Sequence, residues 1–162
     1  MEITTELVKS LRDKTGVSVM QCKKALEEAG GDMEKAMAVL LSKSAEIASK
    51  KSDRALNSGV IATYVHATGG VGVMLELLCE TDFVAKNDEF KSLARDIAMH
   101  ATATNPKYIK AEEGNGDTEN VLLDQAFIKN PEVTIKNLIE SATQKFGENI
   151  ELSRFVRYSI SE

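Results

Sequence analysis

The sequence has few of the residues on which catalytic and metal sites depend. It has only two histidines, His66 and His100, and two cysteines, Cys22 and Cys79, which lie far apart with no second cysteine or paired histidine nearby. A disulfide framework, a zinc site and a nucleophile with an adjacent base are therefore not indicated. We expect reduced, buried cysteines and histidines that are solvated or make a single hydrogen bond. The sequence predicts a protein that is not an enzyme and that uses no metal or cofactor.

Long apolar runs and an excess of positive charge are also missing. The longest apolar stretches cover a few residues, whereas a bilayer span needs roughly 20, and the N-terminus is acidic where a signal peptide would be basic. A net charge of −5 and an aromatic content of 5% disfavour nucleic-acid binding, although Tyr64 and Phe155 could stack on bases. We expect a cytoplasmic protein that contacts neither membranes nor nucleic acids directly.

Residues 1–41 show three short stretches of helical periodicity separated by tight turns. Gly16 ends the first stretch, and Ser18 begins the second with the spacing of a capping box. A glycine pair at Gly30 closes the second helix, and Asp32 is placed to cap the third. The sequence therefore predicts a minimal three-helix bundle.

Residues 42–58 carry alanine, serine and lysine in place of large apolar side chains. They hold four basic and two acidic residues, so this segment has a positive net charge. Its basic side chains are Lys43, Lys50, Lys51 and Arg54. They could line a solvated linker or contact an acidic partner. We interpret the segment as a partly helical linker that leaves the orientation of the bundle adjustable.

From Gly59 the periodicity changes to the alternation typical of β-strands. Two alternating stretches flank a turn at residues 68–70 and predict a hairpin, whose second strand is apolar on both faces, like a central strand covered on each side. A C-terminal strand shows apolar residues at alternate positions, with Arg154 and Arg157 among its polar ones; the apolar residues are Ile150, Leu152, Val156, Tyr158 and Ile160. Helical stretches precede Asn105 and Gly147.

The predicted fold class is α+β, with a helical bundle, a helical linker and then an antiparallel sheet of three or more strands that has helices packed on one face. The predicted domains are residues 1–41, 42–58 and 59–162. Within the last, residues 112–120 have no apolar side chain and are predicted to form a loop.

The start of the second predicted helix is crowded with apolar residues. Val17, Val19 and Met20 lie within four positions, and a bundle of this size can bury them only in part. Val17 could pack as a hydrophobic staple, or the group could form an exposed docking surface.

A second unusual segment, residues 81–84, lies between an apolar strand and a capped helix. Asp82 in this segment cannot enter the core unpaired. The adjacent Phe83 must either fold back onto the core or project outward, and the pattern alone favours the folded-back ring.

These two segments resemble the signature sequences of the elongation factor Ts family. The family's N-terminal signature is similar to TGVSVMQCKKALEEAGGDMEKA, and its second signature to CETDFVAKNDEF. The family's core opens in a way similar to Gly59, Val60 and Ile61, and its C-terminal strand is similar to GENIELSRFVRY. The resemblance covers nearly the whole chain.

The resemblance implies a guanine-nucleotide exchange factor that binds the G domain of elongation factor Tu, disturbs Mg²⁺ and promotes GDP release so that GTP can bind. It implies a bundle of the ubiquitin-associated type that contacts the partner through Val19, Met20, Lys23 and Lys24. It also implies that the residues intruding near the nucleotide site are Thr81, Asp82, Phe83 and Val84. On this basis Phe83 is expected to project outward.

Only one core subdomain fits in this chain, whereas longer family members carry two. The resemblance therefore implies a homodimer or a two-plus-two complex with elongation factor Tu, paired through a sheet edge or the C-terminal strand. An alternative function is a ubiquitin-associated-type adaptor with a dimerising core, which would have no need of an acidic and aromatic pair at Asp82 and Phe83.

Overall fold

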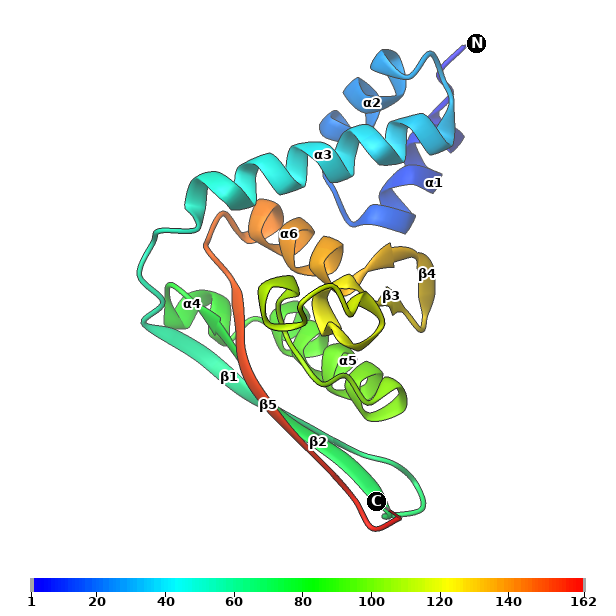
Figure 1. Cartoon of the computed structure of the whole chain (residues 1–162). Helices are drawn as coiled ribbons and strands as arrows, with labels where there is room; N and C mark the ends of the chain where they lie inside the picture. The colour runs from blue at the N-terminus through cyan, green and yellow to red at the C-terminus, as the bar shows by residue number, and fades with distance from the viewer. Residues whose placement is uncertain (1, 162) are drawn as a thin grey trace.

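The computed structural model describes residues 2–161 and begins with a helical unit (Figure 1). Its helices are α1 (Thr5–Thr15), α2 (Val19–Glu28) and α3 (Met33–Lys51). Each begins where the side chain of a capping residue, Thr4, Ser18 or Asp32, accepts a backbone N–H from the first turn. α1 ends at Gly16, whose φ of 69° lies in the left-handed region that glycine favours. The three predicted helices are confirmed.

Helix α3 runs straight through the predicted domain boundary at residue 41. Its second half lies beside α6 (Ile135–Phe146), where Leu41 packs against the core of the sheet unit. Most of the predicted linker is thus a continuous helix that packs against α6. Alanine favours helix formation. Small side chains also allow two helices to approach closely, so a segment with few large apolar residues can still pack against another helix.

The main sheet has three antiparallel strands in the order β1-β2-β5. They are β1 (Ser58–Val65), β2 (Val71–Cys79) and β5 (Glu151–Ser159). Between β2 and β5 come α4 (Asp82–Ala85), α5 (Asp88–Thr104), 3₁₀ turns at Ala111–Glu113, Thr118–Asn120 and Leu122–Asp124, the small hairpin β3 (Ala126–Phe127) and β4 (Asn130–Thr134), and α6. Helix α5 packs on β1 and β2, on one face of the sheet (Figure 1). The α+β class is confirmed.

Buried apolar side chains form two clusters, one in the helical unit and one between the sheet and its helices. The first surrounds Leu26 and contains Cys22, and the second surrounds Phe90 and contains Cys79. Both cysteines are buried as expected, and burial raises the pKa of both thiols. A thiol that stays protonated is a packing group and not a nucleophile.

The alternation predicted for the C-terminal strand is interrupted. Leu77 pairs with Leu152 but Glu76 pairs with Arg154, so Ser153 is an extra residue in a β-bulge. A bulge moves the following side chains to the opposite face. Leu152 therefore points into the core, while the later even-numbered residues Val156, Tyr158 and Ile160 are exposed.

These three side chains lie with Ile61, Val65 and Met74 among the exposed large apolar residues of the sheet. We define the outer sheet face as Ile61, Val65, Met74, Val156, Tyr158 and Ile160. In the described part of the chain, no helix covers these residues, which corrects the expectation that β2 is packed on both sides.

His100 also departs from its expected role. It is fully buried on α5, where Nε2 lies 2.9 Å from Gln125 Oε1 and Nδ1 accepts the backbone N–H of Ile128 at 3.3 Å. This pattern assigns the proton to Nε2. A neutral ring with two partners thus joins α5 to the segment that leads into the small hairpin, whereas the sequence suggested at most one hydrogen bond.

Candidate partner-binding site

Phe83 projects from the short helix α4 into solvent. Its side chain is 91% exposed, whereas the next two residues, Val84 and Ala85, are buried in the core of the sheet unit. A helix of one turn can bury only one side, so anchoring Val84 and Ala85 leaves Phe83 facing outward. The pattern-based prediction of a folded-back ring is wrong, and the expectation drawn from the family resemblance agrees with this geometry.

Asp82 lies beside Phe83 and is held by the sheet. Its Oδ1 accepts a hydrogen bond from Ser58 Oγ at 2.6 Å, at the start of β1. After α4, the side chain of Asn87 accepts the backbone N–H of Glu89 at 2.8 Å and starts α5. The pair Asp82 and Phe83 is therefore held between the start of β1 and the start of α5.

The backbone that enters α4 is held by two residues to which the sequence patterns assign no role. Glu148 and Asn149, in the connection between α6 and β5, form hydrogen bonds with Glu80 and Thr81. Sequence spacing gives no signal for these contacts, because the partners are 67 to 69 positions apart.

The second predicted surface lies at the start of α2. Val17 is buried and packs in the helical unit, so it acts as a core residue, while Val19 and Met20 are 52% and 69% exposed. Lys23 and Lys24 follow one turn later on the same side of the helix and are exposed. The four residues Val19, Met20, Lys23 and Lys24, which we call the α2 patch, combine apolar side chains with positive charge.

The structure does not bring the α2 patch and residues 81–84 together. Helix α2 and helix α4 belong to different units and lie well apart in Figure 1. A partner that contacts both must therefore be large, since it has to reach from one end of α3 to the sheet. This arrangement suits a protein partner better than a small ligand.

Residues 2–161 contain no group of three or more His, Cys, Asp or Glu side chains that could hold a metal ion. Within the same residues, no helix is both long enough and apolar enough to cross a membrane.

Comparison with known proteins gives a consistent family. The model of the family "Elongation factor TS" matches residues 1–117. The elongation factor Ts of Carboxydothermus hydrogenoformans is 43% identical over 195 residues, which cover 99% of this chain and 90% of that protein. The elongation factor Ts of Thermodesulfovibrio yellowstonii is 43% identical over 196 residues, covering 100% and 98% of the two chains.

A third relative, the elongation factor Ts of Fervidobacterium nodosum, is 41% identical over 197 residues that cover both chains completely. All three alignments are longer than the 162 residues of this chain, so these relatives contain residues that it lacks. With a family model that matches most of its length and relatives above 40% identity over nearly all of it, the chain belongs to the elongation factor Ts family of translation elongation factors.

Proposed function

We propose that this chain is a guanine-nucleotide exchange factor for elongation factor Tu. The observation that carries the proposal is the exposure of Phe83. The other four phenylalanines, Phe90, Phe127, Phe146 and Phe155, are buried or half-buried. Leaving an aromatic ring in water forfeits roughly 1.5–3 kcal/mol of burial energy. A ring held outward on an anchored helix turn is suited to insertion into a partner.

In the proposed mechanism, Phe83 enters the G domain of elongation factor Tu near the nucleotide and displaces elements that support Mg²⁺. Mg²⁺ bridges phosphate oxygens and protein ligands, so loss of that support weakens the binding of GDP. Thr81, Asp82 and Val84 set the position of the ring, and Asp82 adds a negative charge beside it. The chain breaks no covalent bond and has no catalytic residue in this scheme.

The coupling between the two ligands of elongation factor Tu must be reciprocal. If the factor weakens nucleotide binding, nucleotide weakens binding of the factor by the same ratio. Incoming GTP therefore releases the factor, and GDP is exchanged for GTP without any energy source in this chain.

The three-helix unit, which we take to be of the ubiquitin-associated type, contributes affinity. In this proposal the α2 patch docks on the G domain, where Val19 and Met20 become buried and Lys23 and Lys24 face acidic side chains. A ubiquitin-associated-type adaptor is less favoured because docking through the α2 patch alone leaves the exposure of Phe83 unexplained.

The outer sheet face supports a homodimer, alone or within a two-plus-two complex. It includes a hollow of about 300 Å³ whose apolar lining contains Val65, Tyr158 and Ile160. The longer relatives have residues that this chain lacks. A second copy of this chain presents the same apolar face, so in a symmetric pair each copy covers the outer sheet face of the other.

The direct test of the proposal is release of fluorescent GDP from elongation factor Tu, measured by stopped flow with and without this protein. Acceleration that rises with the concentration of the chain supports the proposal. An unchanged release rate at saturating concentrations refutes it.

A further inference from the structure

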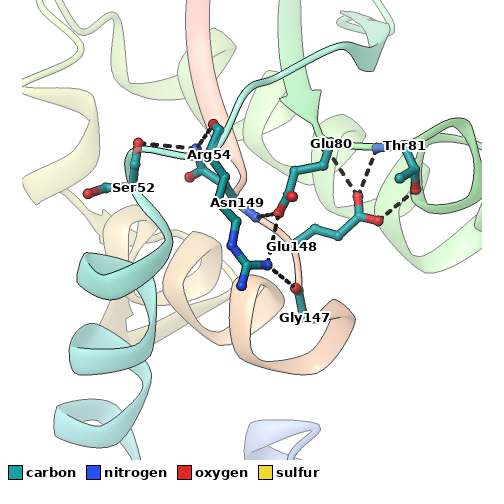
Figure 2. A network of polar contacts seen from close by, with 7 residues as sticks. All are labelled: Ser52, Arg54, Glu80, Thr81, Gly147, Glu148 and Asn149. Atoms are coloured by element: carbon teal, nitrogen blue, oxygen red, sulfur yellow. Dashed lines mark hydrogen bonds and ion pairs between the residues drawn. The ribbon is translucent and has the colours of Figure 1, made fainter.

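The connection between α6 and β5 meets the connection between β2 and α4 through a set of polar contacts (Figure 2). Glu148 is at its centre. Its Oε1 accepts the backbone N–H groups of Glu80 at 3.1 Å and Thr81 at 3.0 Å, and its Oε2 accepts the hydroxyl of Thr81 at 2.6 Å. Hydrogen bonds to a carboxylate are stronger than those between neutral groups. One side chain therefore holds three donors at the entry to α4.

The contacts run in both directions. Glu80 Oε2 accepts the backbone N–H of Asn149 at 2.6 Å and lies 3.6 Å from Arg54 Nη1, which compensates part of its charge. The amide of Asn149 donates to the backbone oxygens of Ser52 at 3.3 Å and Arg54 at 2.9 Å. The end of α3, the end of β2 and the start of β5 are thus joined at one place (Figure 2).

The two parts of this network act on different segments. Asn149 and Arg54 connect the end of α3 to the sheet unit, which is a structural task. Within residues 2–161, the hydrogen bonds of the Glu148 carboxylate go to residues 80 and 81, immediately before the exposed ring of Phe83.

The hydrogen bond from Thr81 to Glu148 replaces the usual capping hydrogen bond of α4. Thr81 is the N-cap residue of α4, but its side chain makes no capping hydrogen bond to that helix. An N-cap threonine ordinarily uses its hydroxyl oxygen to accept an N–H of the first turn. Here the hydroxyl is turned toward Glu148 instead. The orientation of α4 is therefore fixed from outside the helix.

We propose that Glu148 is a positioning residue for exchange, which holds the entry to α4 so that Phe83 is presented in one orientation. This inference rests on the proposed function. Without Glu148, Val84 and Ala85 still anchor the far end of α4, but Thr81 and Asp82 gain freedom. This segment must then become ordered when Phe83 docks. The free-energy cost of that ordering lowers the affinity for the partner and slows exchange.

The test compares four variants with the wild-type chain in the GDP-release assay with elongation factor Tu: Glu148→Ala, Glu148→Gln, Phe83→Ala and the double variant Glu148→Ala with Phe83→Ala. Glu112→Ala, which removes a carboxylate from an exposed 3₁₀ turn, is the matched control. Melting temperature and the amide hydrogen exchange of residues 81–84 are measured on the same samples.

We expect Glu148→Ala to slow exchange by roughly tenfold, an effect of the size that ordering a few side chains on binding produces. Glu148→Gln should recover most of the rate, because the amide oxygen can accept the two N–H groups and the amide nitrogen can donate to the hydroxyl of Thr81. Amide exchange of residues 81–84 should rise in Glu148→Ala and stay unchanged in Glu112→Ala.

The double variant separates positioning from an independent role. If Glu148 acts through Phe83, the double variant is no slower than Phe83→Ala alone. An additive loss would show that Glu148 acts by itself and would overturn the inference. So would a wild-type rate in Glu148→Ala, or unaltered amide exchange in residues 81–84. A wild-type chain that does not accelerate GDP release refutes the proposed function and the role of Glu148 in exchange together.

Discussion

Ser44 on α3 donates a hydrogen bond of 2.5 Å to Gln144 on α6, which lies 100 positions away in the sequence. Ser44 is buried, so this bond lies inside the contact between the two helices. The contact means that α3 belongs to both units, with its first half closing the helical unit and its second half covering α6.

This double role predicts different results for two truncations. Removal of residues 1–41 takes away the helical unit but leaves the part of α3 that holds Ser44, so the sheet unit should stay folded. Removal of residues 1–57 uncovers α6 and should lower the melting temperature further.

Ser44→Ala in the full chain should lower the free energy of unfolding by about 1 kcal/mol, the net value of a typical hydrogen bond. Equal melting temperatures for the two truncations would contradict the conclusion that the second half of α3 stabilises the sheet unit.

Phe83→Ala should slow GDP release by about tenfold or more, since the proposed mechanism requires the ring. The melting temperature should hardly change, because the side chain is exposed. Phe90→Ala is the matched control, since Phe90 is fully buried and its truncation should cost roughly 3–5 kcal/mol of stability. A large loss of stability with normal exchange in Phe83→Ala would rule out the proposed role of the ring. Asp82→Ala should act in the same direction but less strongly.

The α2 patch is tested by the double substitution Val19→Asp with Met20→Asp. Charges placed in an apolar contact are costly to desolvate, so binding to elongation factor Tu should weaken strongly. The fold should be retained because both side chains are exposed. Ala38→Asp adds a charge at an exposed position of α3 and serves as the control. Calorimetry that finds equal affinities for the two variants would exclude the patch from the interface.

The starts of α2 and α3 and the end of α1 could be predicted from the sequence because they depend on neighbours along the chain. The end of α3 could not be predicted, because its second half packs against α6, which is distant in sequence. Ser18 and Asp32, the two caps predicted from the sequence, accept backbone N–H groups from residues three positions further on. The bulge at Ser153 could not be predicted, because it depends on the pairing of β5 with β2. Its effect was to place Val156 and Tyr158 on the outer sheet face.

The candidate site was predictable in part. The resemblance to a family signature pointed to Phe83, while hydrophobic patterning alone favoured the wrong orientation of its ring. Patterning failed because the anchoring is done by Val84 and Ala85, and a single helix turn leaves no periodicity to read. Glu148 was missed because its three donors are distant in sequence.

His100 should make stability depend on pH. Burial lowers its pKa below the ordinary value of 6.5, so the folded state holds the ring neutral. The stabilising contribution is complete above pH 6.5 and is lost as the pH falls from 6.5 toward the pKa of the folded state. Urea unfolding between neutral pH and mildly acidic pH should show this decline. It should disappear in His100→Gln and persist in the control His66→Gln, whose side chain is exposed.

The outer sheet face predicts a homodimer of about 35 kDa, twice the 17.7 kDa mass of the chain. Tyr158 and Ile160 are 76% and 90% exposed, and a second copy would remove both from water. Tyr158→Asp with Ile160→Asp should therefore give a monomer in light scattering at tens of micromolar. Ile128→Asp, an exposed apolar position in the turn of the small hairpin, should stay dimeric. A wild-type monomer at these concentrations would refute the homodimer, and under the proposed function a single core would then have to suffice for exchange.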